Sequence, residues 1–246
     1  MDNQTLALIP LLFVAATLFS AVGHGGATAY LAAMALVAVA PETMRPAALI
    51  LNIFVASIAL YKFYQVRAFS TQLFLPLALS AVPFAFIGGL LTLPSHFYKP
   101  VIGATLVFAG WHIFSGAKKI GIEQIKQVST VTLILIGSAL GFLSGLTGIG
   151  GGVFLSPILL GFKWAETKVV SGVAAGFILV NSISGLIGVM TKSHTLPTHL
   201  PYWVAAVILG GLLGSVYGSR KLANPTIRKI LAVILVFAGL KMLING

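Results

Sequence analysis

The chain has 246 residues, of which 58% are hydrophobic and only 8% charged, and its mean hydropathy is +1.05. This composition is typical of an integral membrane protein and excludes a soluble domain. The net charge of +11 comes from basic residues in short loops between apolar runs, so we interpret it as a topology signal and a contact to lipid headgroups, not as a nucleic-acid surface.

Apolar runs bounded by polar, Pro or Gly residues predict an all-α, polytopic transmembrane protein with about ten helices. The first run follows an acidic start and is long, so we interpret it as an uncleaved span and not as a signal peptide. The predicted helices cover residues 5–22, 27–40, 46–64, 72–93, 98–115, 129–146, 151–162, 168–191, 200–218 and 226–244. The second and seventh reach only about 20 Å, whereas a hydrocarbon core is about 30 Å thick.

Both short helices follow a cluster of glycines, which we call the first and the second break. The second break is Gly145-Leu-Thr-Gly-Ile-Gly-Gly-Gly152, and the first is its weaker copy, Val22-Gly-His-Gly-Gly-Ala27. Glycine in a helix interior costs roughly 1 kcal/mol relative to alanine, so each cluster should end one helix and start another. The unpaired N–H groups and the positive end of the new helix would then favour an anion.

Four short matches in the same order predict an internal duplication. They pair Val22–Ala27 with Thr147–Gly152, Val55–Ile58 with Val180–Ile183, Gly88–Leu91 with Gly210–Leu213, and Leu106–Gly110 with Leu235–Gly239. Each half holds five helices, an odd number, so the second half must enter the membrane from the opposite face. This is the inverted-topology repeat of secondary transporters. We expect the first repeat at 1–115, a basic cytoplasmic linker at 116–128 and the second repeat at 129–246.

The basic residues in the loops distinguish spanning from re-entrant short helices. If both short helices span, one face carries eleven Lys and Arg, and the other carries four: Arg45, Lys99, Lys192 and Lys241. If both re-enter, the faces carry seven and eight. Only the ten-span arrangement follows the positive-inside rule, and it predicts both termini on the outer, periplasmic side.

We expect the two breaks to meet near the membrane midplane and to form one substrate-binding site. Its candidate residues are Gly23, His24, Gly25, Gly26, Asn52, Thr147, Gly148, Gly150, Gly151, Gly152 and Asn181. Ser144 adds a second hydroxyl beside Thr147. The alternative for the glycines is close helix packing, which we prefer for glycines outside the breaks: Gly88, Gly89, Gly210, Gly211 and Gly214.

Three of the polar candidates allow two interpretations. His24 is the only ionisable group that this topology places well inside the membrane, so it would bind an anion as imidazolium or relay a proton. Its alternative role is a neutral ring bonded to a backbone carbonyl. Asn52 and Asn181 either contact substrate or join helices, whereas we favour packing for Ser57 and Ser182. Aromatic residues near helix ends predict an interfacial belt: Tyr98, Trp111, Tyr202 and Trp203.

No enzyme motif is visible in the sequence. It has no Cys, no HExxH or Walker A motif, no metal-ligand spacing, and only four acidic residues for acid–base chemistry. We therefore expect a protein that is not an enzyme, with no catalytic residues, metal or cofactor.

The segment Gly148-Ile-Gly-Gly-Gly-Val-Phe-Leu-Ser-Pro-Ile-Leu-Leu160, its echo at Gly23–Ala27 and the duplicated Leu-Val-Phe-Ala-Gly resemble the sulfite exporter family TauE/SafE, also called the 4-toluene sulfonate uptake permease family. The resemblance covers nearly the whole chain. It implies a bacterial inner-membrane transporter for small sulfur-containing anions such as sulfite or sulfonates, acting as an importer or an exporter. His24 departs from the longer glycine run that is frequent in this family.

We therefore expect a secondary transporter, or permease, for a sulfonate or sulfite-like anion, with alternating access around the site at the two breaks. Its partners would be the small anionic substrate and membrane lipids, with a homodimer left open. Two alternatives are an anion channel and a non-catalytic membrane subunit of a larger assembly.

Overall fold

The computed structural model describes residues 3–92, 94–115, 125–192 and 195–220, together with 233, 235–237, 239–240 and 243–244. The regular elements of this part are nine α-helices. They are α1 (Asn3–Ser20), α2 (Ala27–Leu36), α3 (Pro41–Gln65), α4 (Thr71–Leu90), α5 (Ser95–Ser115), α6 (Thr130–Thr147), α7 (Gly152–Gly161), α8 (Thr167–Met190) and α9 (Leu200–Arg220). The all-helical class is confirmed. The predicted tenth helix and most of the predicted linker lie outside the described residues.

Five of these helices, α3, α4, α6, α8 and α9, are long and apolar enough to cross a membrane. The start of α3 differs from the prediction, because the helix begins at Pro41 and continues through Pro46. Pro41 occupies the first helical position, where its missing N–H would have no partner, whereas Pro46 lies in the second turn and leaves the Glu42 carbonyl without its helical donor. Arg45, which we placed in a loop, therefore lies on the helix, and its side chain is only 7% exposed. Arg45 therefore no longer counts as a basic residue in a loop. The face predicted to carry four basic loop residues keeps three, which increases the charge asymmetry between the two faces.

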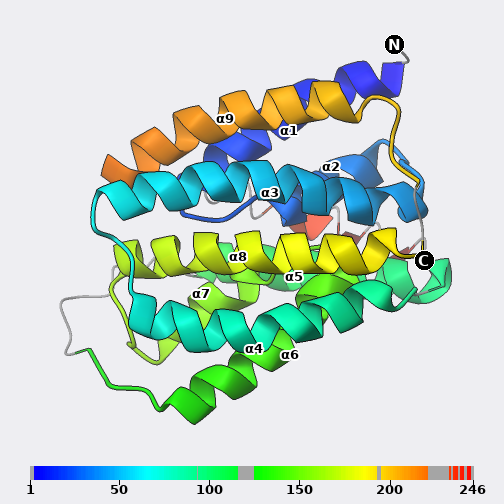
Figure 1. Cartoon of the computed structure of the whole chain (residues 1–246). Helices are drawn as coiled ribbons and strands as arrows, with labels where there is room; N and C mark the ends of the chain where they lie inside the picture. The colour runs from blue at the N-terminus through cyan, green and yellow to red at the C-terminus, as the bar shows by residue number, and fades with distance from the viewer. Residues whose placement is uncertain are drawn as a thin grey trace.

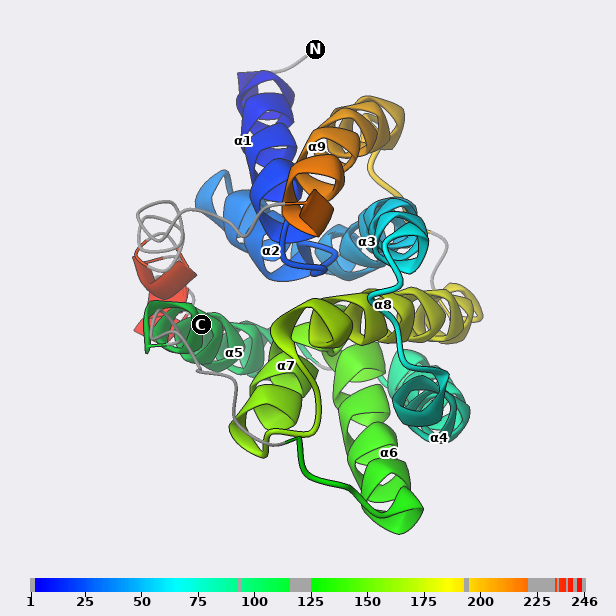
Figure 2. The same ribbon diagram turned by 90° about the vertical axis from the view of Figure 1, so that its left-hand side faces the viewer.

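The long helices α3 and α8 lie between two helix pairs, α1 with α9 on one side and α4 with α6 on the other (Figures 1 and 2). Leu49 of α3 faces Gly185 of α8, and Phe63 faces Gly172, so these two central helices run antiparallel. The corresponding helices of the two halves thus point in opposite directions.

Rows of glycines allow the two helices of each outer pair, α1 with α9 and α4 with α6, to pack closely. Gly210 and Gly214 of α9 lie against backbone carbonyls of α1, and Gly218 lies against that of Ala21, just after α1. Gly137, Gly141 and Gly145 of α6 lie against backbone carbonyls of α4. A Cβ at any of these six positions would collide with a carbonyl oxygen. The packing role predicted for Gly88, Gly89, Gly210 and Gly214 is confirmed in the same way, because small residues let helix backbones approach within a membrane.

The two largest hydrophobic cores each mix the two halves of the sequence, and a smaller third cluster lies between α3 and α8. The first is built mainly from α1, α2, α3, α5 and α9, with Ile149 and Val153 from the second break and α7, and the second from α4, α6, α7 and α8. Helix α9 of the second half thus completes the core of the first half, and α4 of the first half completes that of the second. The breaks lie where these two cores meet.

The two short helices have the same local geometry at an offset of 125 residues. Each has ten residues, or about 15 Å, and each ends with a left-handed residue, Ala38 after α2 and Lys163 after α7. The next N–H then bonds back across the turn, from Val39 to Met34 and from Trp164 to Leu159, both at 2.9 Å. This Schellman-type ending occurs without glycine in both halves.

The predicted aromatic belt is wrong for two of its four members. Trp111 and Tyr202 are exposed, but the side chains of Tyr98 and Trp203 are only 4% and 3% exposed. Tyr98 donates its hydroxyl to the Thr147 carbonyl, 3.3 Å away. A residue near a helix end can face either lipid or the bundle, and the rotation of the helix about its axis decides which.

Candidate functional site

The two breaks converge on one place at mid-length of the central helices. A Cβ on Gly25 or on Gly150 would collide with the side chains of both Asn52 and Ile178. Asn52 lies close to the middle of α3, and Ile178 lies close to the middle of α8. Two segments about 125 residues apart in sequence thus share one buried environment, halfway along the helices that bracket them.

The Asn52 amide joins the two breaks through hydrogen bonds. Its Oδ1 accepts from the N–H of Ala27, the first residue of α2, at 3.1 Å. Its Nδ2 donates to the carbonyl of Ile149 in the second break, at 3.3 Å. The interhelical role that we considered for Asn52 is therefore present, and the same side chain also lies at the centre of the candidate site.

The first break is closed by its own residues. The Tyr30 hydroxyl of α2 donates to the Gly25 carbonyl at 2.7 Å, and the Tyr30 ring covers Gly26. Gly26 has φ +100°, a conformation that side chains rarely adopt. With Asn52 bonded to the first N–H of α2, this helix N-terminus is already partly satisfied.

Among the described residues, the second break has more unpartnered buried hydroxyls than the first, beside which that of Thr28 lies. Gly148, Gly150 and Gly151 all have positive φ, which only glycine adopts readily. The hydroxyls of Ser144 and Ser182 are buried and have no hydrogen-bond partner. Ser182 lies beside Gly150, and Ser144 lies beside Gly151, the residue that precedes α7. Buried hydroxyls normally have partners, so these two groups beside a helix N-terminus favour a ligand that accepts hydrogen bonds.

The site is occluded in this conformation. The side chain of Ile178 fills the space between the breaks, where it approaches Gly25, Gly150 and Gly152. Every predicted site residue is buried except His24, which is partly exposed. Entry of a substrate therefore requires both a displacement of Ile178 and a path from one face.

Several predicted site residues lie away from this centre. Gly23 packs against the Ser171 backbone near the start of α8, and Gly148 packs against Arg45 near the start of α3. The His24 ring lies 3.0 Å from the Val22 carbonyl through Nδ1, and its edge meets Phe19. This carbonyl contact is the one that we gave as its alternative role.

Thr147 and Asn181 use their side chains within their own helices. The Thr147 hydroxyl donates to the Leu143 carbonyl at 2.7 Å, and it caps the chain by accepting from Ile149 N–H at 3.4 Å. Asn181 donates from Nδ2 to the Phe177 carbonyl at 2.9 Å, while its buried Oδ1 has no partner. These contacts leave the Asn181 carbonyl oxygen, but not the Thr147 hydroxyl proton, available to another group.

Arg45 is the main residue that the sequence analysis missed. Its guanidinium donates to the carbonyls of Gly88, Gly89 and Leu91 at the end of α4, and to that of Gly145 near the end of α6. His24 is therefore not the only ionisable group inside the bundle. The sequence analysis missed this role because a charged residue next to a proline, in the segment Pro41–Pro46, suggested a loop.

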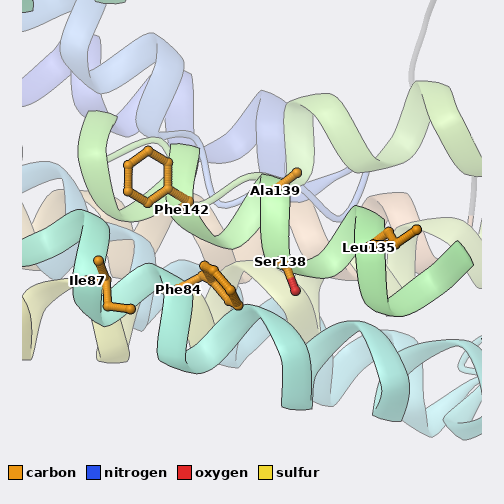
Figure 3. Close-up of a pocket in the computed structure, with 6 residues that line it drawn as sticks. All are labelled: Phe84, Ile87, Leu135, Ser138, Ala139 and Phe142. Atoms are coloured by element: carbon orange, nitrogen blue, oxygen red, sulfur yellow. The ribbon is translucent and has the colours of Figure 1, made fainter. Parts of the chain in front are cut away.

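A groove of about 410 Å³ between α4 and α6 lies elsewhere and has a different character (Figure 3). Its lining residues are Phe84, Ile87, Leu135, Ser138, Ala139 and Phe142. Three of them, Phe84, Ile87 and Leu135, are large exposed hydrophobic residues, as expected of a surface that faces lipid. The groove contains none of the predicted site residues.

Comparison with known proteins identifies the family. The pattern of the sulfite exporter TauE/SafE family matches residues 8–242. A probable membrane transporter protein of Sinorhizobium fredii is 37% identical over 246 residues, covering 99% of this chain and 100% of the relative. A probable membrane transporter protein of Methanocaldococcus jannaschii is 26% identical over 200 residues, covering 76% of this chain and 73% of the relative. No solved structure matches significantly. The chain therefore belongs to the sulfite exporter TauE/SafE family and is a multi-pass membrane transporter.

Proposed function

We propose that this protein is a secondary transporter for a small sulfur-containing anion, a sulfonate or sulfite, with alternating access around the paired breaks. The observation that carries the proposal is the convergence of Gly25 and Gly150 on Asn52 at mid-length of α3 and α8. Broken helices that meet near the midplane are how such transporters expose polar backbone to a substrate.

The repeat supports a carrier over a channel. The short helices α2 and α7 have matching lengths and endings, and α3 and α8 run antiparallel, as two inverted five-helix repeats at 1–115 and 129–246 require. Two halves with inverted structure favour two mirror-related conformations, each open to one face. The occlusion by Ile178 would then be the intermediate between them.

The chemistry of the second break supports an anion. The N-terminus of α7 carries partial positive charge, and three groups around it can donate hydrogen bonds: Ser144, Ser182 and the Asn52 amide. A tetrahedral sulfonate or sulfite head accepts several such bonds at once. In the described part of the chain the two carboxylates, Glu42 and Glu166, are exposed at helix starts, so neither competes at this site.

The test is ligand-induced stabilisation of the purified protein. A panel of sulfite, thiosulfate, sulfoacetate, taurine, 4-toluenesulfonate, acetate and a cation control would be compared by thermal shift. A ligand at a hundred times its Kd stabilises the folded state by about 2.7 kcal/mol, which is a shift of several degrees. We expect stabilisation by a sulfur anion and not by acetate; stabilisation by acetate or the cation alone would contradict the substrate class.

Flux in proteoliposomes then separates the transport mechanisms. A carrier gives saturable uptake and counterflow of the stabilising anion. Non-saturating conductance would show a channel, and uptake that begins only after a partner protein is added would show a subunit of a larger assembly. Either of these results would contradict the alternating-access proposal.

A further inference from the structure

Arg45 is a buried cation whose hydrogen bonds hold the two halves of the chain together at one face. It belongs to α3, and it donates to α4 of the first half and to α6 of the second. The distances to Gly145, Leu91 and Gly88 are 3.0, 2.8 and 2.7 Å, from Nε, Nη1 and Nη2. The carbonyls that it binds lie where two helices end, where carbonyls commonly lack an intrahelical donor, although that of Gly88 also accepts from the Leu91 N–H at 3.3 Å.

The position of Arg45 places it between the breaks and the face at which α3 begins. It precedes Asn52 by seven residues, about 10 Å along the helix, and it lies one turn inside Pro41. Its aliphatic stem packs on Gly148 of the second break. Opening a path from that face to the breaks would separate the ends of α4 and α6 from α3, and would therefore break the contacts of Arg45.

The opposite face differs at the position equivalent to Arg45. The residue that corresponds to Arg45 at the offset of 125 is Val170, an apolar residue in the second core. At that end, Gly23 packs on the Ser171 backbone. The two faces are therefore closed differently, one by a cation on carbonyl oxygens and the other by apolar packing.

Among the residues that the structure describes, backbone dipoles balance the charge of Arg45. All its hydrogen bonds go to backbone carbonyls, and in the described part of the chain no carboxylate accepts from it. The nearest acidic residue along the chain, Glu42, is exposed. A guanidinium binds an anion more strongly than it binds neutral carbonyls, in a planar, two-pronged geometry that suits two oxygens of a sulfonate or sulfite.

We propose that Arg45 closes the face at which α3 begins, and that the arriving substrate anion opens it by taking the guanidinium away from the helix-end carbonyls. Arg45 is then a specificity-determining residue, because neutral molecules and cations cannot compete for it. This proposal rests on the proposed function for the identity of the anion, but not for the closing role itself.

The absence of Cys from the chain makes a direct test available. An I149C variant carries a single thiol in the second break, where Ile149 is buried. A membrane-impermeant thiol reagent is applied to each face in vesicles of defined orientation. We expect slow labelling from the face at which α3 begins, accelerated at least tenfold by the sulfur anion that stabilises the protein. We expect fast labelling from the same face in R45Q/I149C without any anion.

The matched control is R67Q/I149C, which removes an exposed arginine from the loop after α3 and should label at the rate of I149C. Labelling of R45Q/I149C that rises equally from both faces would show general loosening of the bundle and overturn the proposal. So would labelling at the parental rate in folded protein. If R45Q does not fold, R45K/I149C decides. A lysine keeps the charge but cannot reach four carbonyls, so labelling without anion should already be fast, and parental labelling would overturn the proposal.

Different results would contradict the proposed substrate class and the proposed closing role of Arg45. If no sulfur anion stabilises or accelerates labelling of the parent, the proposed substrate class is wrong. Face-selective labelling of R45Q/I149C would still show that Arg45 closes that face. If the anion binds and is transported while Arg45 variants label like the parent, only the closing role is wrong.

Discussion

The two breaks share a sequence pattern and a helix length, but they differ in how their polar groups are satisfied. In the first break, Tyr30 and Asn52 occupy the Gly25 carbonyl and the first N–H of α2, and the buried hydroxyl of Thr28 has no partner. In the second, three glycines with positive φ, Gly148, Gly150 and Gly151, lie beside the unpartnered hydroxyls of Ser144 and Ser182. We infer that the first break mainly holds the site in place and that the second break offers more hydrogen-bond donors to the ligand.

The largest expected effect is at Gly150. In G150V the side chain would require φ +81° and would collide with the Asn52 amide, so we expect at least about a hundredfold loss of transport with retained expression. G25A would meet Asn52 Oδ1 but keeps an ordinary φ, so we expect a smaller loss there. The measurement is uptake in proteoliposomes.

The matched control for these variants is G161A. Gly161 ends α7 and has open space where a Cβ would be, so uptake should be unchanged. If G150V transports like G161A, the second break is not the site.

A smaller effect is expected at Ser182, in a direction that separates binding from stability. The hydroxyl has no partner in this conformation, so S182A should not lower the melting temperature. If the hydroxyl donates to the anion, its loss should weaken binding about tenfold, which corresponds to about 1.4 kcal/mol. Thermal shift and ligand titration measure the two quantities on one sample.

Ser57 supplies the control for Ser182, because it lies at the corresponding position of the first half. It is exposed, and its hydroxyl donates to the Ile53 carbonyl of its own helix at 2.6 Å. S57A should bind the anion like the parent. Equal affinities for S57A and S182A would remove the difference that we infer between the two breaks.

The smallest effect is expected at His24, which is partly exposed and lies toward the opposite end from Arg45. An imidazole gains its proton near neutral pH, and the protonated form attracts an anion. H24A should therefore weaken binding by about threefold below neutral pH, and this difference should vanish as the pH rises. H199A, outside the breaks, serves as the control. A pH-independent difference would mean that His24 acts only through its contact to the Val22 carbonyl.

Much of the fold was predictable, because membrane-spanning helices require long apolar runs and few polar residues separate these runs. The start of α7 at Gly152 and that of α8 at Thr167 agree with the prediction within one residue. The predicted repeat led us to expect that the two breaks meet, and Gly25 and Gly150 do lie against the same Asn52 side chain. Arg45 was missed because Pro46 suggested a boundary, whereas α3 begins at Pro41 and continues through Pro46. The burial of Tyr98 and Trp203 depends on helix rotation, which a uniformly apolar sequence does not encode.

The exchange of α4 and α9 between the two cores has a consequence for biogenesis. The first core includes Leu200, Trp203 and Val207 of α9, so it cannot close until that part of the chain has been synthesised and inserted. Until then the glycine-facing surface of α1 lacks its partner. Either predicted half made alone would therefore be incompletely packed in the bilayer. Two separately synthesised halves should form the complete bundle only by associating with each other.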